Sequence, residues 1–317
     1  MRKLLAAVLS ALLFVTASIP AWALTEEEMD AALEARGREA LAACVDDGMT
    51  DLEKLTALHD WLALHCDYGA SPRSQTAYGA LVEGTAVCIG YAAGLGYLAA
   101  LAGLDGTYTY SEELDHAWAL ATLDGGRYFS DCTWDDGKNQ KMGLIRHTYF
   151  LFDEINAPSK GHYGWDSRER VRGGPLEDVP WTAAVTRVIF HGDFAYYFDG
   201  DFRLIRCDRA TWETEELLAL PDRWPDTDPP DGRDPEIYTG LVLIRERLYF
   251  NTPTALCYYD LTDGTVKTAL TPDTGERRIY GVSVRNGVLC YSLADGANAI
   301  LFDVIETGIS ARRAWGG

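Results

Sequence analysis

Three side chains that together could perform nucleophilic chemistry lie in the first half of the chain. Cys88 lies in the segment TAVCIGYA, His116 in DHAW and Asp131 in DCTWDD. Nucleophilic acyl transfer uses these residue types, because a thiolate attacks the carbonyl, an imidazole moves the proton and a carboxylate orients the imidazole. The sequence therefore predicts a Cys-His-Asp catalytic triad.

The segment around Cys88 is predicted to begin a helix. Small and apolar residues recur at helical spacing over 89–101, Thr85 is a candidate N-cap and Gly103 ends the pattern. Cys88 then lies in the first helical turn, where free backbone N–H groups and the helix dipole favour a thiolate. Glycines inside the pattern weaken a helix and so indicate close packing against another element: Gly90, Gly94 and Gly96.

The other two members of the predicted triad flank a β-hairpin. A strand over 117–123 and a returning strand over 127–131 are joined by a tight turn at Asp124-Gly125. This register places Asp131 one diagonal step, about 7 Å between backbones, from His116 on the same face of the hairpin. We therefore expect the hairpin to bring the imidazole and the carboxylate together.

These motifs resemble those of the transglutaminase-like superfamily of cysteine enzymes, in particular its bacterial exported members. The resemblance covers about 51–165 and rests on AYGAL, VCIGYA, HAW and DCTWDD in the order of the family, followed by YFLFDEI. It implies an α+β core with the transglutaminase-like (papain-like cysteine proteinase) fold. It also implies that Cys88 is the nucleophile, His116 the general base and acid, and Asp131 the orienting carboxylate, with the backbone N–H of Cys88 in an oxyanion hole.

The N-terminus predicts export. Arg2 and Lys3 precede an apolar run over 4–19 and the sequence AWA at 21–23, which is the pattern of a secretory signal peptide cleaved after Ala23. The apolar run is short for a membrane span. We therefore expect a signal peptide over 1–23 and a secreted protein that does not insert into a membrane.

Charge and cysteine content limit the classes of partner. Without Arg2 and Lys3 the chain has 26 basic and 48 acidic residues, a net charge of −22. This balance disfavours nucleic acid or anionic lipid as a partner, because phosphate binding needs clustered cations. Export would permit disulfides among the seven cysteines, whose odd number leaves at least one thiol unpaired. Neither CxxC nor HExxH occurs, so no metal or cofactor is expected.

Two capping boxes predict helices ahead of the Cys88 segment. Thr25 with Glu28 and Thr50 with Glu53 each place a Thr three residues before a Glu, and each is expected to open a helix of about 15 to 18 residues. We expect two histidines of the second helix to be packing or surface residues: His59 and His65.

The last part of the chain changes to a β pattern. Three segments, 185–198, 241–251 and 280–291, each show a strand, a turn and an aromatic-rich strand. The units resemble blades of extracellular β-propellers, which have four to eight blades. Three copies leave an open edge, so the prediction is a propeller-like repeat domain that recognises or places substrate, without closure.

The domain prediction is a signal peptide over 1–23, a transglutaminase-like catalytic domain over 24–175 and a β-rich propeller-like repeat domain over 181–317. The predicted reaction is attack on an amide bond of protein or peptide through a Cys88 thioester, with hydrolysis favoured over transfer to an amine. Two alternatives stay open. One is a catalytically inactive extracellular binding module, and the other is a hydrolase of a non-peptide amide. The sequence does not specify the oligomeric state.

Overall fold

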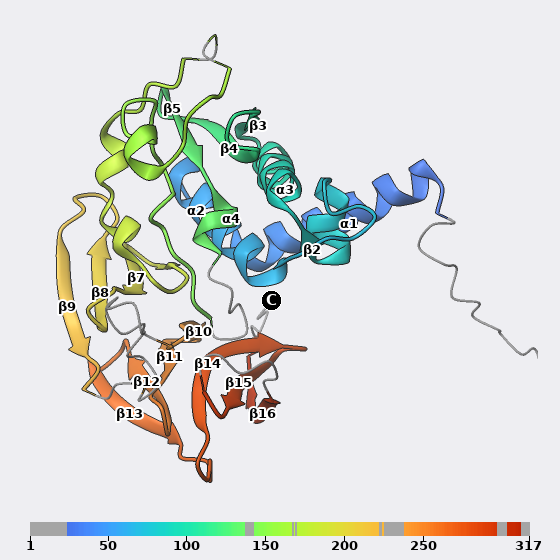
Figure 1. Ribbon diagram of the computed structural model, residues 1–317. Helices are drawn as coiled ribbons and strands as arrows, with labels where there is room; N and C mark the ends of the chain where they lie inside the picture. Colours follow the sequence, from blue (N-terminus) through green and yellow to red (C-terminus); the bar gives the residue numbers. More distant parts are fainter. Residues whose placement is uncertain are drawn as a thin grey trace, which may run out of the picture.

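The computed structural model describes residues 24–136, 143–166, 168, 170–221, 224, 238–296 and 303–311. The predicted signal peptide over 1–23 lies outside the described residues. None of the helices within these ranges has the length and apolar character needed to cross a bilayer. The chain folds into helices and mostly antiparallel sheets (Figure 1).

Two helices begin at the predicted capping boxes. Helix α1 spans Glu26–Cys44 and α2 spans Asp51–His65, and in both the N-cap threonine and the glutamate three residues later exchange hydrogen bonds. Helix α2 is buried along most of its length, whereas α1 buries only Gly37 and Ala40. Because α2 packs on α3 (Cys88–Leu101), these two helices form the centre of the first core.

A three-stranded antiparallel sheet covers α3. Its strands run in the order β3 (Asp105–Ser111), β4 (His116–Leu123) and β5 (Gly126–Ser130). Leu123 pairs with Gly126, so the two-residue turn at Asp124-Gly125 forms as predicted. The returning strand ends one residue earlier than expected, because Asp131 is the N-cap of the short helix α4 (Cys132–Asp135).

Short elements lie between α2 and α3 and again between α4 and the sheets that follow. The strands β1 (Asp67–Tyr68) and β2 (Thr85–Ala86) pair in parallel, and a π-helix, η2, lies between them. Among the described residues, three 3-10 helices lie between α4 and the next sheet. These four elements are η2 (Gly79–Glu83), η4 (Ala157–Lys160), η5 (Pro175–Asp178) and η6 (Pro180–Ala183).

Three antiparallel sheets make up the rest of the described chain, and in each of them consecutive strands are neighbours. Their turns lie in the segments in which the sequence predicts strand, turn and strand. The first sheet contains β6 (Ile189–His191), β7 (Phe194–Phe198), β8 (Arg203–Asp208) and β9 (Thr214–Ala219). The second contains β10 (Val242–Ile244), β11 (Arg247–Asn251), β12 (Leu256–Asp260) and β13 (Thr265–Leu270). The third contains β14 (Arg278–Arg285), β15 (Val288–Ala294) and β16 (Asp303–Ser310).

The sheets are packed in sequence order. Phe198 of the first sheet contacts Phe250 of the second, with ring centroids 5.5 Å apart, and β14 of the third sheet packs against β11. The first sheet also shares a hydrophobic core with α2 and α3, through residues that include Tyr197 and Ile205. The core is therefore continuous across the predicted boundary near residue 181. Division into two domains and a propeller arrangement of the sheets stay predictions.

Candidate active site

Cys88 is the first residue of α3. The prediction that Thr85 is the N-cap is wrong. Thr85 lies in β2, and its pairing with Asp67 keeps the chain extended up to Val87. Val87 is the N-cap, and its apolar side chain cannot accept a hydrogen bond from the helix. The first turn of α3 therefore presents its backbone N–H groups without a side-chain cap, which favours negative charge at Cys88.

Glycines hold this turn against the preceding loop. A Cβ on Gly90 would lie 2.2 Å from the carbonyl oxygen of Ser74, and the same oxygen accepts a hydrogen bond from the Val87 N–H at 2.9 Å. On the next turns, Gly94 faces Ala80 and Gly96 faces the backbone of Thr107. The predicted close packing of these glycines is confirmed, and it fixes the position of the residue that precedes Cys88.

The hairpin joins His116 to Asp131. The Nε2 atom of His116 lies 2.6 Å from Oδ2 of Asp131, and both side chains are buried. The second carboxylate oxygen, Oδ1, accepts hydrogen bonds from the N–H groups of Thr133 at 3.0 Å and Trp134 at 3.2 Å, as the N-cap of α4. The carboxylate is therefore fixed through both oxygens, and its orientation sets that of the imidazole.

Cys88 completes a chain of hydrogen bonds. The His116 side chain hydrogen-bonds to the thiol and lowers the pKa of Cys88, against the effect of burial and with help from the backbone N–H groups of Ala117 and Ile89. Burial acts to lower the pKa of His116, but the hydrogen bonds with Asp131 and Cys88 outweigh it and raise this pKa to about 9. Because Nε2 is bound to Asp131, Nδ1 is the ring nitrogen left to exchange a proton with the thiol.

The other thiols differ from Cys88. Burial raises the pKa of Cys44 and Cys66 to about 12 and that of Cys207 to about 11, and it also raises the pKa of Cys132 and Cys290. No disulfide joins these cysteines, all of which the structure describes. Cys88 is partly exposed, as is Cys44. Among Cys88 and the five thiols with a raised pKa, Cys88 alone combines access to solvent with a lowered pKa.

A second histidine, which the sequence did not predict, binds the same carboxylate. Nε2 of His162 lies 2.9 Å from Oδ2 of Asp131, and Nδ1 lies 3.0 Å from the carbonyl oxygen of Lys160. We refer to His116, Asp131 and His162 as the site cluster. His162 belongs to no motif, and its only sequence signal is its position inside the segment 51–165 that carries the family resemblance.

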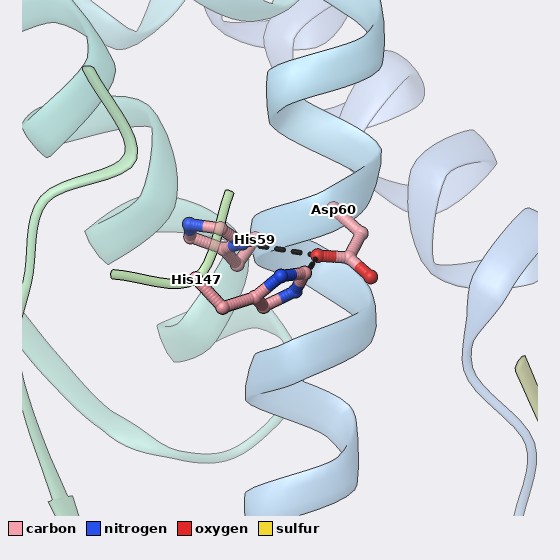
Figure 2. Close-up of side chains that lie close together, drawn as sticks. All are labelled: His59, Asp60 and His147. Atoms are coloured by element: carbon pink, nitrogen blue, oxygen red, sulfur yellow. Dashed lines mark hydrogen bonds and ion pairs between the residues drawn. The ribbon is translucent and has the colours of Figure 1, made fainter. Parts of the chain in front are cut away.

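A similar group of side chains lies deeper in the protein. Figure 2 shows that His59 and Asp60 of α2 meet His147, which comes from the loop after α4. His59 Nδ1 lies 3.0 Å and His147 Nε2 lies 2.8 Å from the same oxygen, Oδ1 of Asp60. We refer to these three residues as the interior cluster. His59 packs in the core as expected, but its polar partners were not predicted.

The interior cluster connects α2 to other parts of the chain. The second oxygen of Asp60 accepts a hydrogen bond from the Val188 N–H at 2.7 Å, and His147 Nδ1 lies 3.1 Å from the carbonyl oxygen of Ala184. His59 Nε2 lies 3.4 Å from the carboxylate of Asp135, at the end of α4. Burial acts to lower the pKa of His59, but its contacts with Asp135 and Asp60 raise this pKa to about 9.

Both clusters have donor atoms close enough together to be considered as metal sites. In each, one oxygen and two imidazole nitrogens lie within 4.8 Å of one another. Two ligands of one tetrahedral zinc ion are about 3.3 Å apart, because each lies about 2.0 to 2.1 Å from the ion. The nitrogen–oxygen distances here are 2.6 and 2.9 Å in the site cluster and 3.0 and 2.8 Å in the interior cluster. These distances are those of hydrogen bonds, and we assign them as such.

Comparison with known proteins gives distant structural likenesses. No protein-family model matches the chain, and no curated protein sequence matches it. A solved structure of a TGase is 17% identical, with a TM-score of 0.30, over 37% of this chain and 35% of that one. A structure from Cytophaga hutchinsonii, provisionally named a cysteine protease, is 18% identical, with a TM-score of 0.27, over 36% of this chain and 45% of that one.

A third likeness is to a computationally designed protein, Ika4. It is 11% identical, with a TM-score of 0.25, and covers 60% of this chain and 86% of that one. The chain spans less than half the length of the TGase and of the Cytophaga hutchinsonii protein. At these TM-scores, the likenesses carry no argument about activity, which has to be argued from the site itself.

Proposed function

We propose that the protein is an exported, transglutaminase-like cysteine enzyme that hydrolyses amide bonds of proteins or peptides through a thioester at Cys88. The observation that carries the proposal is the chain of hydrogen bonds from the Cys88 thiol through His116 to Asp131, which lowers the pKa of the thiol. The motif resemblance supports the reaction class. The signal-peptide pattern over 1–23 supports export.

The proposed reaction begins with attack of the Cys88 thiolate on the amide carbonyl carbon. The oxyanion of the tetrahedral intermediate would accept hydrogen bonds from backbone N–H groups at the start of α3, because Val87 offers them no side-chain cap. The carbon–nitrogen bond then breaks, its electron pair stays on nitrogen, and Nδ1 of His116 donates the proton that releases the amine. A thioester remains on Cys88.

Water completes the cycle. His116 takes a proton from the water, whose oxygen attacks the thioester carbonyl. The carbon–sulfur bond breaks, and its electron pair restores the thiolate while the product leaves as a carboxylic acid. Asp131 stays ionised throughout, since hydrogen bonds from His116 and His162 keep its pKa below the usual value despite burial. Its role is to hold His116 in one tautomer.

Hydrolysis is favoured over transfer to an amine because water can reach this thiol. Cys88 is partly exposed, and Tyr68, whose strand pairs with β2 just before Cys88, is 63% exposed. Transfer to an amine would require a site that excludes water. The polar loop over 69–75, which packs against α3 through Ser74, also borders the turn that carries Cys88.

The three β-sheets would recognise or place the substrate. The first of them is held against α2 by the shared hydrophobic core and by the ion pair between Arg209 and Glu53, whose carboxylate is buried. A substrate bound on this sheet would therefore have a fixed position relative to α2 and α3. The proposal gives the sheets a binding role and leaves the chemistry to Cys88.

Thiol labelling tests the nucleophile without knowledge of the substrate. Brief treatment of the folded protein with iodoacetamide near neutral pH, read by mass spectrometry, should modify Cys88 before Cys44. Cys44 is the internal control, because it is also partly exposed but has a pKa of about 12. Labelling of Cys44 with Cys88 unreactive would contradict the proposal.

A peptide library tests the reaction. Incubation with the protein should release new carboxyl termini, and the Cys88→Ala variant should release none. Incorporation of an added primary amine in place of cleavage would replace hydrolysis by transfer. A complete lack of turnover, with Cys88 unreactive, would favour the inactive binding module. Release of ammonia or of a non-peptide group from modified substrates would favour the alternative that the protein is a hydrolase of a non-peptide amide.

A further inference from the structure

His162 is placed to influence the reaction without touching Cys88. Its Nε2 atom lies 2.9 Å from Oδ2 of Asp131, and Nε2 of His116 lies 2.6 Å from the same oxygen. The other oxygen of the carboxylate already accepts two backbone hydrogen bonds as the cap of α4. Asp131 therefore receives four donors, and the two imidazoles share one oxygen.

The hydrogen-bond partners of His162 define its protonation. Nε2 faces a carboxylate, and Nδ1 faces the carbonyl oxygen of Lys160 at 3.0 Å, so both partners are acceptors only. A neutral imidazole donates from one nitrogen, and its other nitrogen would then face an acceptor with no proton between them. We therefore assign a proton to each nitrogen and a positive charge to the ring.

Aromatic rings surround this charge. The ring centroids of Trp134, Phe152 and Trp118 lie 4.5, 4.8 and 4.8 Å from that of His162, with interplanar angles of 53°, 52° and 86°. The ammonium group of Lys160 is a further cation near these rings: it donates to the carbonyl oxygen of Thr148 and lies 6.0 Å from the centroid of the Phe152 ring. The His162 ring is fully buried, so solvent does not screen its charge.

From this arrangement we propose that His162 is a positioning residue that holds Asp131 as an imidazolium and thereby leaves His116 free to give up its proton to the leaving amine. The proposal rests on the proposed function. The anion of Asp131 favours the proton on His116 and raises the pKa of the imidazole, which opposes release of that proton. A second cation on the same oxygen weakens this effect, and it also favours the thiolate of Cys88.

The titratable groups around the ring determine the expected pH effect. Asp131 and His116 face His162 directly, Tyr149 faces it with ring centroids 5.7 Å apart, and Cys88 lies beyond His116. A neutral replacement removes a positive charge from this group. The pKa of the Cys88 thiol and the pKa of His116 should then both rise, because the thiolate loses a favourable charge and the imidazolium loses an unfavourable one.

The variant His162→Gln tests this, since glutamine keeps an N–H donor for Asp131 but carries no charge. The readout is the rate of Cys88 alkylation by iodoacetamide as a function of pH, which requires no substrate. We expect the whole profile to move to higher pH by on the order of one unit. A profile that superimposes on that of the unchanged protein would overturn the proposal.

A matched control is His191→Gln in the first β-sheet. His191 is partly exposed, and its Nε2 atom lies 3.0 Å from a carboxylate oxygen of Glu246. It comes from another part of the sequence and has no role in the proposed chemistry, so its replacement should leave the alkylation profile unchanged. A shift of equal size in this variant would show that the effect is general, and it would also overturn the assignment to His162.

If the His162→Gln variant does not fold, nuclear magnetic resonance of the unchanged protein tests the proposal instead. With six histidines in the sequence, ¹⁵N-labelled imidazole signals can be resolved, and both nitrogens of His162 should carry protons at neutral pH. A neutral His162 ring would overturn the proposal. If Cys88 is unreactive while His162 is charged, the proposed function fails and the charge assignment stands.

Discussion

Two carboxylates in this protein each bind two histidines through a single oxygen, yet the two groups do different things. In the site cluster the carboxylate is Asp131, and its imidazole neighbour His116 hydrogen-bonds to a thiol. In the interior cluster the carboxylate is Asp60, and both imidazoles point to other buried acceptors. The same arrangement of one aspartate and two histidines therefore occurs in two different surroundings. What distinguishes the site cluster is the hydrogen bond from His116 to the Cys88 thiol.

The second oxygen of each carboxylate shows what else each cluster does. In Asp131 it caps α4, the short helix that begins at the next residue. In Asp60 it accepts a hydrogen bond from the N–H of Val188, which lies 128 residues further on and directly precedes β6, the first strand of the first β-sheet. The site cluster thus contacts the Cys88 thiol through His116, whereas the interior cluster ties α2 to the segment that leads into the first β-sheet. Substitutions should separate these two roles.

The largest expected effects come from exchanging each aspartate for asparagine. Asp131→Asn keeps an oxygen for the cap of α4 but cannot accept both imidazole protons, so turnover should fall by about 10³ to 10⁴-fold. Asp60→Asn leaves two imidazoles and the Val188 N–H without a full set of acceptors, and the free energy of unfolding should fall by roughly 3–5 kcal/mol. Urea unfolding and peptide turnover measure the two quantities.

The comparison depends on these effects being distinct. Folded Asp60→Asn should still show rapid alkylation of Cys88, since no atom of the interior cluster contacts the thiol in the described structure. If Asp60→Asn lowered alkylation as much as Asp131→Asn, the two clusters would form one functional unit, and the separation drawn here would be wrong.

A smaller effect is expected from filling the space at Gly90. The variant Gly90→Ala places a Cβ 2.2 Å from the backbone oxygen of Ser74, which has to move together with the turn that carries Cys88. We expect a loss of about 1–3 kcal/mol in the free energy of unfolding and slower alkylation of Cys88. Gly94→Ala is the matched control, because its Cβ meets the side chain of Ala80 at 3.1 Å, one turn further from the thiol.

The stability of the protein should also depend on pH. The pKa of His59 is raised to about 9 from 6.5, so its contribution to stability is complete below about pH 6.5 and is lost as pH rises through 9. The pKa of Asp60 is lowered from 3.8, so its contribution is present above that pH and is lost on acidification. The pKa of His116 is also raised to about 9, so its contribution to stability is likewise lost as pH rises through 9.

Urea unfolding between pH 6 and about 10 should measure the contribution of each cluster to this pH dependence. Stability of the unchanged protein should decline over this range, and His59→Gln and His116→Gln should each remove part of the decline. His191→Gln should leave the decline as it is. If His59→Gln preserved the full decline, the interior cluster would not carry the charge assigned to it.

Local features of the sequence were enough to predict much of the site. The capping boxes at Thr25 and Thr50 form as expected, because their partners are three residues away on the same helix. The turn at Asp124-Gly125 sets the register of its hairpin, and this register brings His116 to Asp131. Both depend on geometry that a few neighbouring residues determine. The N-cap of α3 was predicted wrongly, because the pairing of Thr85 with Asp67 comes from a residue 18 positions earlier.

The sequence by itself determined the residue types and local geometry of the Cys88, His116 and Asp131 group. Only the tertiary structure decided which further side chains bind the carboxylates of Asp131 and Asp60. His162 reaches Asp131 from 31 residues away, and His147 reaches Asp60 from 87 residues away, across loops whose paths no periodic pattern encodes. The physical reason is that hydrogen bonds within a turn or hairpin follow from backbone geometry, whereas contacts between distant segments depend on how whole helices and sheets pack.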